Sequence, residues 1–260
     1  MDFNNTYHIS HHRPKYLSPF IYGFSIYHFT DNAPVRLNPE GYFELIFQLN
    51  GGFHQKPTDT GDWVSRPEFF VGGLHNKSFN IRPEKKGSKL ISVNFKPQYT
   101  RFFIPDKLHV YKNKVVELND IFRLTELKKI EPLQNNGHPE NKLDLIESFL
   151  GGIFKDKSTT TIDRALHIIF QKNGFVNIRE LAEKSCLSIS QFRKRFNEEV
   201  GMSPKEYTKI IRIRYISEFL SQHPSLNLTQ LTYKLGYFDQ SHFIKDFKSV
   251  TGVSPKNYSA

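Results

Sequence analysis

The feature that most constrains this chain is an internal repeat in its last hundred residues. When that part is slid along itself, residues match at an offset of 50 and, further on, of 51. The matched pairs are Asn177 and Asn227, Leu181 and Leu231, Lys184 and Lys234, Ser190 and Ser241, Phe192 and Phe243, Lys194 and Lys245, Phe196 and Phe247, Gly201 and Gly252, and Tyr207 and Tyr258. Self-similarity of this kind indicates two copies of one supersecondary unit. The extra residue falls between helices, where an insertion in a turn costs little.

Each copy has the sequence pattern of a helix-turn-helix, over about 177–200 and 227–251. In the first, Asn177 and Ser188 are suited to cap two helices on either side of a turn at 185–187. The second helix ends at Gly201, which favours a helix C-terminus. In the second copy, Leu228, Leu231 and Leu235 line the first helix and Gly236 makes the turn. Asp239 caps a second helix that ends at Gly252.

The second helix of each copy is expected to have one buried and one polar face. At about 100° per residue, Phe192 and Phe196 point into the core, as do Phe243 and Phe247. The residues expected to face double-stranded DNA, with Gln191, Gln240 and His242 at the edges, are Ser190, Gln191, Arg193, Lys194, Asn197, Gln240, Ser241, His242, Ile244, Lys245 and Lys248. Arg and Lys suit guanine edges, Asn and Gln suit adenine, and an exposed aliphatic such as Ile244 suits a thymine methyl. The alternative for each residue taken singly is an ordinary solvated surface.

A third helix is expected between the two copies. Pro204 is suited to open it, and apolar residues follow through Lys205–Leu220 as far as His223-Pro224. Sixteen or so residues span roughly 24 Å as a helix. A rod of that length would hold two recognition helices near one turn of DNA apart, about 34 Å.

The N-terminal part has a different pattern. Segments 42–49, 78–82 and 90–95 have the composition or alternation of strands, and Gly and Pro occur frequently between them. Helical spacing then appears over 118–130 and 143–153, in helices that could pack on the strands or pair across a dimer. The polar run 155–160 is the best linker. The chain is therefore predicted to be an α+β multidomain protein, with a β-rich, cupin-like or barrel-like domain and trailing helices over 1–155 and an all-α domain over 156–260.

Charge and composition narrow the class of partner. Lys and Arg number 36 against 26 Asp and Glu, and residues 161–260 hold 15 of the basic and nine of the acidic residues. A basic excess favours a polyanion, because bound phosphates release counterions. The single cysteine excludes an intrachain disulfide, and no apolar run approaches the roughly 20 residues of a membrane span. We expect a cytoplasmic protein with no membrane partner.

The repeat also resembles a known family, the AraC/XylS-type transcription regulators, over about 165–260. The resemblance is carried by Ile178-x-x-Leu181-Ala182, Ser188-x-Ser190-x-Phe192-x-Lys194-x-Phe196, Gly201-x-Ser203-Pro204-x-x-Tyr207, Arg212, and Leu231-x(4)-Gly236-Tyr237-x-Asp239-x-Ser241-x-Phe243-x-Lys245-x-Phe247-Lys248-x(3)-Gly252-x-Ser254-Pro255-x-x-Tyr258. It implies two recognition helices in successive major grooves. Lys194 and Lys245 depart from a frequent Arg in the family, and Lys lacks the bidentate fork.

The resemblance extends weakly to the N-terminal part, which is similar to the sensor half of some members of the family. It implies a small-molecule effector or a homodimer without distinguishing them. It also implies a bacterial protein, with transcription activation and RNA polymerase as a further partner, although activation and repression stay open.

Two other functions were weighed. A cupin-type enzyme would need metal ligands, but the chain has no His-x-His pair, and His8, His11 and His12 lie near the N-terminus. Cys186 falls in the first turn, where a small core residue is expected rather than a nucleophile. We expect no catalysis, no cofactor and no metal. The second alternative is an architectural DNA-binding module without sensing, against which the long aromatic N-terminal part argues.

Overall fold

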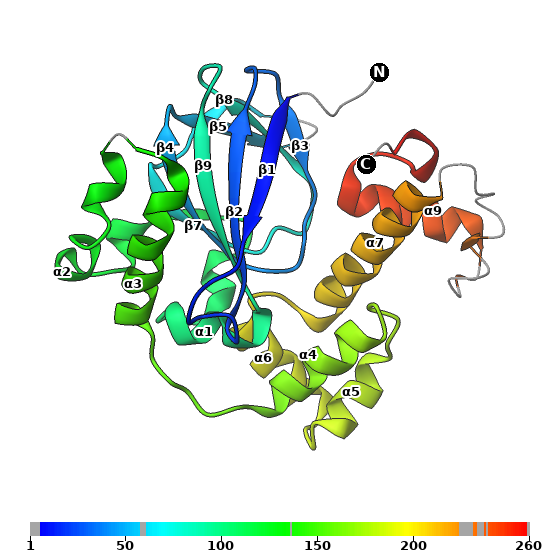
Figure 1. Cartoon of the computed structure of the whole chain (residues 1–260). Helices are drawn as coiled ribbons and strands as arrows, with labels where there is room; N and C mark the ends of the chain where they lie inside the picture. Colours follow the sequence, from blue (N-terminus) through cyan, green and yellow to red (C-terminus); the bar gives the residue numbers. More distant parts are fainter. Residues whose placement is uncertain are drawn as a thin grey trace.

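The computed structural model describes residues 6–57, 61–135, 137–223, 231–232, 237 and 239–258. It contains a β-sandwich followed by helices, in the order that the sequence predicts (Figure 1). None of the helices in these residues is long and apolar enough to cross a membrane. The predicted fold class, an α+β chain with a β-rich N-terminal part and a helical C-terminal part, is confirmed.

In the described residues, ten strands form two sheets, one of six strands in the order β1-β2-β9-β4-β7-β10 and one of four in the order β3-β8-β5-β6. Every pair within them is antiparallel. The strands are β1 (Tyr7–His12), β2 (Ile21–Phe29), β3 (Val35–Leu37), β4 (Glu44–Asn50), β5 (Phe53–Pro57), β6 (Val64–Ser65), β7 (Phe69–Gly72), β8 (Phe79–Pro83), β9 (Lys89–Phe95) and β10 (Val115–Glu117). The three strand segments predicted from sequence correspond to β4, β8 and β9.

The central strands of the larger sheet are covered on both faces. On β4, Leu45 and Phe47 pack with the helices on the outer face, while Ile46 packs with residues of the second sheet. Glu44 and Gln48 share the inner face with Ile46, because side chains alternate along a strand. On β9 the predicted polar face is also enclosed, and Ser92 is only 1% exposed. The space between the sheets therefore holds polar groups.

Short helices surround the larger sheet. They are the 3₁₀ helices η2 (Pro97–Tyr99), η3 (Leu108–Tyr111), η4 (Leu118–Asp120), η5 (Glu131–Gln134) and η6 (Pro139–Lys142), and the α-helices α1 (Thr100–Phe103), α2 (Leu124–Leu127) and α3 (Leu143–Ile153). Figure 1 shows α2 and α3 beside this sheet. The helix expected over 143–153 is confirmed as α3, which packs on the sandwich: Glu147 accepts hydrogen bonds from the backbone N–H groups of Lys15, Tyr16 and Leu17.

The single helical segment expected over 118–130 is wrong in detail, because the chain there forms η4 and α2 with a break between them. Arg123 has an extended backbone, and its N–H donates to the Glu126 carboxylate 2.8 Å away. This local capping starts a new helix at Leu124, and apolar spacing alone does not reveal it.

In the described residues of the C-terminal part, all the regular elements are helices. Its helices are α4 (Thr161–Gln171), α5 (Ile178–Lys184), α6 (Ile189–Val200), α7 (Pro204–Gln222), α9 (Gln240–Thr251) and the 3₁₀ helix η7 (Pro255–Asn257). Segment 155–160, the predicted linker, contains no helix or strand. In Figure 1, α4, α5 and α6 lie together below the sandwich, and α7 runs from them towards α9.

Helix α7 joins two hydrophobic clusters. Ile210 and Ile211 belong to the largest cluster, which includes the sandwich, α3 and the first helix-turn-helix. Ile213 and Ile216 belong to a second, smaller cluster with α9. The largest cluster continues across residue 155, because η3 and Phe43 pack against α6 and the residue that ends it. The first copy of the repeat is therefore packed directly on the β-sandwich.

Candidate nucleic-acid interface

Helices α6 and α9 are built alike from equivalent residues. At their starts, the Ser188 hydroxyl accepts from the Gln191 N–H at 3.3 Å, and the Asp239 carboxylate accepts from the His242 N–H at 2.7 Å. Both end at a glycine in the left-handed region, Gly201 at φ +106° and Gly252 at φ +77°. The predicted caps and helix ends are confirmed, as is the cap of α5 by Asn177.

The inward faces of the two helices also match. Phe192 and Phe196 are fully buried in the first copy, and Phe243 and Phe247 in the second. A tyrosine packs edge-on against the second phenylalanine of each helix. The ring centroids of Phe196 and Tyr207 are 5.6 Å apart, and those of Phe247 and Tyr258 are 5.2 Å apart. The repeat found in the sequence is therefore a repeat of packing.

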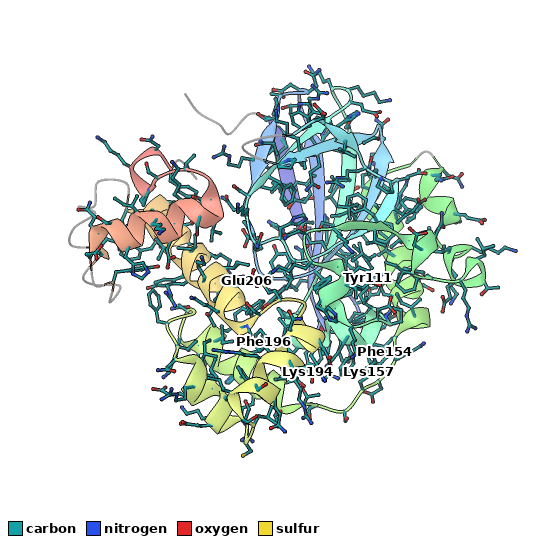
Figure 2. All side chains as sticks on the ribbon, turned by 180° about the vertical axis from the view of Figure 1, so that it is seen from behind. Tyr111, Phe154, Lys157, Lys194, Phe196 and Glu206 are labelled. Carbon is teal, nitrogen blue, oxygen red and sulfur yellow. The ribbon has the colours of Figure 1, made fainter. Side chains whose placement is uncertain are left out.

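Most of the predicted contact residues lie on the exposed faces of α6 and α9. Exposed are Ser190, Gln191, Arg193 and Lys194 on α6, and Gln240, Ser241, His242, Lys245 and Lys248 on α9. Figure 2 labels Lys194 and the buried Phe196, which come from opposite faces of α6. Asn197 and Ile244 are half-buried. The β-sandwich leaves the exposed residues uncovered, and they form two polar ridges.

The expectation of an exposed Ile244 is wrong. Its side chain packs against the smaller hydrophobic cluster beside α7, and this contact explains an apolar residue at that position without DNA. Gln191 is exposed, but its side chain accepts a hydrogen bond from the Ser188 N–H at 3.1 Å, which completes a capping box. The Nε2 atom of His242 lies 3.8 Å from a carboxylate oxygen of Asp246, which is one turn further along α9.

Cys186 is also placed differently from the expectation. It is exposed, with φ at +53°, and the neighbouring Ser185 is the buried residue of this turn. Cys186 therefore does not fill the core.

Part of the second copy lies outside the described residues, including Leu228, Leu235 and Gly236. Leu231 and Tyr237 are described, and both are buried in the smaller cluster. Arg212, which carries part of the family resemblance, extends between the two copies. Its guanidinium lies over the rings of Phe175 and Tyr237 and donates to the Gly174 carbonyl at 3.2 Å.

Sequence reasoning missed a loop that contacts both copies. Segment 38–41 between β3 and β4, named here the hub loop, receives a hydrogen bond from the Tyr207 hydroxyl at the Gly41 carbonyl, 2.8 Å. At its other end, the Asn38 amide donates to the Tyr258 hydroxyl at 3.2 Å. These are the two tyrosines that are equivalent in the repeat. Arg214 of α7 adds a hydrogen bond to the Glu40 carbonyl at 2.7 Å.

A second contact holds the start of α7 to the sandwich. Glu206, labelled in Figure 2, accepts hydrogen bonds from Lys112 at 2.6 Å, Asn76 at 3.3 Å and Ser203 at 2.7 Å. Burial opposes the charge of Glu206, but these three donors outweigh it and hold its pKa at about 2. The link is therefore ionic at neutral pH.

A cavity of about 750 Å³ lies between the sheets and reaches the C-terminal part. Its walls include Glu44, Gln48 and Arg66 of the sandwich, the hub loop, and Val253, Asn257 and Tyr258 beyond α9. The sequence contains one signal for it, because Glu44 and Gln48 interrupt an otherwise apolar strand on one face. Two polar residues four apart on a buried strand indicate a lined cavity rather than a plain core.

The histidines considered as metal ligands lie on β1. His11 shares a hydrogen bond with Ser25 at 3.1 Å, and His12 shares one with Ser10 at 2.9 Å. In the part of the chain that the structure describes, no three His, Cys, Asp or Glu residues gather in a way that could hold a metal ion.

A β-sandwich joined to two helix-turn-helix units, with two exposed polar ridges, defines the class of helix-turn-helix regulators with an attached N-terminal domain. A family model described as "Helix-turn-helix domain" matches residues 181–260, and a "Domain of unknown function (DUF6597)" matches residues 10–117. The resemblance of the C-terminal part to AraC/XylS-type transcription regulators is supported by this helix-turn-helix match and by relatives that are named as regulators.

Individual relatives match the chain over part of their length. The Msm operon regulatory protein of Streptococcus mutans is 28% identical over 118 residues, which are 44% of this chain and 42% of that protein. The porin thermoregulatory protein EnvY of Escherichia coli is 34% identical over 84 residues, 32% of each chain. The activator RhaR of Salmonella arizonae is 24% identical over 103 residues, 40% of this chain and 34% of that protein. The chain thus spans less than half the length of these relatives.

Among solved structures, ToxT from Vibrio cholerae O395 is similar over 90% of this chain and 95% of its own, with a TM-score of 0.48 and 14% identity. A fatty-acid-bound ToxT covers 98% of this chain and 95% of its own, with a TM-score of 0.46 and 15% identity.

Proposed function

We propose that this chain is an effector-responsive transcription regulator that binds double-stranded DNA at two successive major grooves. The observation that carries the proposal is the structural equivalence of α6 and α9, which expose matching positions while burying matching phenylalanines. Residues 156–260 supply DNA binding in this proposal, and residues 1–155 supply the sensing domain.

The length of α7 supports binding by both copies at once. Its 19 residues extend roughly 28 Å at the rise of an α-helix. Successive major grooves on one face of DNA repeat at about 34 Å. Since α7 packs into both hydrophobic clusters, it fixes the separation of the two copies.

The proposed DNA contacts are the exposed residues of the two ridges, with Asn197 and Ile244 at their half-buried margins. Arg193 is suited to a guanine edge through its planar fork. Lys194, Lys245 and Lys248 carry single point charges and are suited to phosphates. The Gln191 side chain completes a helix cap, and the His242 ring lies 3.8 Å from the Asp246 carboxylate, so their contacts to DNA would be secondary.

The cavity and the hub loop support response to an effector. The cavity wall includes the hub loop, and the hub loop is hydrogen-bonded to both equivalent tyrosines. An occupant that moves this loop would therefore change the contacts of both copies with the sandwich. RhaR is named a transcriptional activator, which supports activation here. We further propose RNA polymerase as a partner and the cytoplasm as the place of action.

The test is to recover genomic fragments bound by the full chain and to measure affinity for a recovered fragment and for a scrambled duplex. We expect the double substitution Arg193→Ala and Lys194→Ala to abolish the preference for the recovered fragment, because it removes both cations of the α6 ridge. Exposed substitutions change stability by about 0.5 kcal/mol or less, so circular dichroism should be unchanged.

The matched control is Lys85→Ala with Lys86→Ala, which removes two exposed charges from the turn between β8 and β9. It should retain the preference. Unchanged affinity of the α6 variant for both duplexes would contradict the proposal. Equal weakening on both duplexes would limit these residues to phosphate contacts.

A further inference from the structure

The cavity between the sheets contains a cation that lacks a partner. Arg66 follows β6 and lines the cavity, and its Nε is buried without a hydrogen-bond acceptor. Within the described ranges of the chain, Arg66 takes part in no ion pair. Burial alone lowers the pKa of Arg66 to about 10, so the guanidinium remains charged at neutral pH. The Arg66 side chain is half-buried, and a charge held partly out of water is costly unless an anion compensates it.

The surroundings of Arg66 hold it in place without neutralising it. The Gln48 amide donates to the Pro67 carbonyl at 2.7 Å and fixes the backbone beside Arg66. His75 also lines the cavity, and the centroid of its ring lies 4.4 Å from the centroid of the Phe79 ring. Burial, aided by the charge of Arg66, lowers the pKa of His75 to about 4, so His75 is neutral at pH 7. This side of the cavity therefore presents one net positive charge.

A carboxyl group lines the same cavity at a distance from Arg66. Glu44 lies four residues before Gln48 on β4, which is roughly 13 Å along a strand. The Ser92 hydroxyl donates to Glu44 at 2.9 Å, and Tyr27 and Tyr42 also line the cavity. Glu44 and Arg66 form no ion pair with each other in the described residues. A carboxyl in this place accepts hydrogen bonds from hydroxyl or amino groups.

Apolar walls lie between these polar groups. Ile46, Phe53, Phe70 and Leu90 line the cavity and belong to the cluster between the sheets. They suit the carbon skeleton of a small molecule and give no partner to a second charge. The cavity therefore combines Arg66, the hydrogen-bonding carboxyl of Glu44 and an apolar surface, and its wall beside the C-terminal part also includes Arg36, which donates to the Thr251 carbonyl at 3.4 Å, and Glu40.

We propose that the cavity binds a small organic anion, whose carboxylate or phosphate group contacts Arg66 and whose hydroxyl or amino groups contact Glu44. The proposal deepens the proposed function, on which it rests, by naming the chemical class of the effector. It makes Arg66 the group that selects an anion, and it makes Glu44 the group that selects a polar body over a simple fatty acid.

The first experiment is calorimetric titration of the full chain at neutral pH with four probes: gluconate, glucose 6-phosphate, glucose and octanoate. At least one of the two hydroxylated anions should bind, and which of them binds more tightly identifies carboxylate or phosphate as the head group. Glucose lacks the charge, and octanoate lacks the hydroxyl groups, so each should bind at least about tenfold more weakly. Glucose binding as tightly as the anions would overturn the proposal, as would the failure of both hydroxylated anions to bind.

The second experiment compares Arg66→Gln with the matched control Arg82→Gln. Arg82 lies over the Trp63 ring, 4.7 Å from its centroid, and is not part of the cavity wall. Arg66→Gln should weaken binding of the anion by roughly 10- to 100-fold, and Arg82→Gln should leave it unchanged. Without ligand, Arg66→Gln should melt no lower than the unsubstituted chain, because it removes an uncompensated buried charge. A lower melting temperature together with unchanged anion binding would show a purely structural role.

DNA binding is measured on the same preparations with the recovered fragment. Selective DNA binding without anion binding would overturn this inference alone. Anion binding without selective DNA binding would leave the cavity assignment standing and overturn the proposed function.

Discussion

Burial raises the pKa of Glu44 from 4.5 to about 7, although the Ser92 hydroxyl partly stabilises the charged form. Between these pH values the unfolded chain releases the proton while the folded chain retains it. The contribution of Glu44 to folding stability is therefore fully present below pH 4.5 and is lost as pH rises through about 7. A residue that costs stability at neutral pH fits a role in binding.

We expect Glu44→Gln to increase the free energy of unfolding at pH 8 by roughly 3 kcal/mol, because the pKa rises from 4.5 to about 7 and each unit of pKa corresponds to about 1.4 kcal/mol. At pH 4 the substitution should have little effect. Urea unfolding at the two pH values measures the difference, and Glu183→Gln, an exposed change on α5, is the control. A destabilised variant at pH 8 would show that the charged carboxyl has a stabilising partner.

Phe247 of α9 fills the core of the second copy and packs edge-on against Tyr258. Truncation of a fully buried phenylalanine leaves a cavity that a small cluster cannot close. We expect Phe247→Ala to cost about 3–5 kcal/mol in urea unfolding. Lys248→Ala, one residue along on the exposed side, should cost about 0.5 kcal/mol or less. Similar costs for the two changes would mean that α9 is not packed as described.

The helical period predicted which residues of α6 and α9 point inward, and the phenylalanines and the caps are where it placed them. The helical period could not predict which residues of these helices are covered by neighbouring elements. Ile244 is half-buried because α7 lies beside it, and Cys186 is exposed because its backbone is left-handed. Arg66 gave no local signal, since its place in the cavity depends on how the two sheets pack against each other.

At the scale of elements, the end of α6 lies against the sandwich. A side chain at Gly201 would place Cβ 3.0 Å from the Phe43 ring and 3.2 Å from the Leu108 carbonyl. Gly201 also has a left-handed backbone, at φ +106°. The junction between the first copy and the sandwich therefore requires glycine twice, for conformation and for space.

We expect Gly201→Ala to destabilise the chain by more than Gly87→Ala does. Gly87 has a left-handed φ of +82° but open space around it, so it reports the conformational cost alone, about 1 kcal/mol. Thermal unfolding of the two variants measures the excess, which is the cost of separating α6 from Phe43. An equal loss of stability in the two variants would indicate that α6 and Phe43 move apart at little cost.

The order and type of the elements could largely be predicted, because strand alternation and helical spacing are local. The boundaries of β4, β9, α6 and α7 lie within a few residues of the predicted ones. The break in segment 118–130 could not be predicted, since the capping interaction of Arg123 with Glu126 competes with the apolar spacing. The role of the hub loop could not be predicted, because each of its hydrogen bonds to the C-terminal part joins residues more than 150 positions apart.

At the scale of the whole molecule, α7 fixes the distance between the two ridges. An operator should therefore tolerate no change in the spacing of its two contacted segments. We expect insertion of five base pairs between them to abolish tight binding, and insertion of ten to weaken it strongly as well, because the helix cannot lengthen. Anisotropy titrations with the three duplexes measure this. Full recovery at ten base pairs would point to a flexible link between the copies.

The hub loop contacts equivalent tyrosines in the two copies of the repeat, Tyr207 in one and Tyr258 in the other. A shift of segment 38–41 consequently reaches both halves of the DNA-binding part at once. In a genetic selection for cells that express the target genes without inducer, altered alleles should accumulate in this short stretch, at codons remote from every base-contacting position.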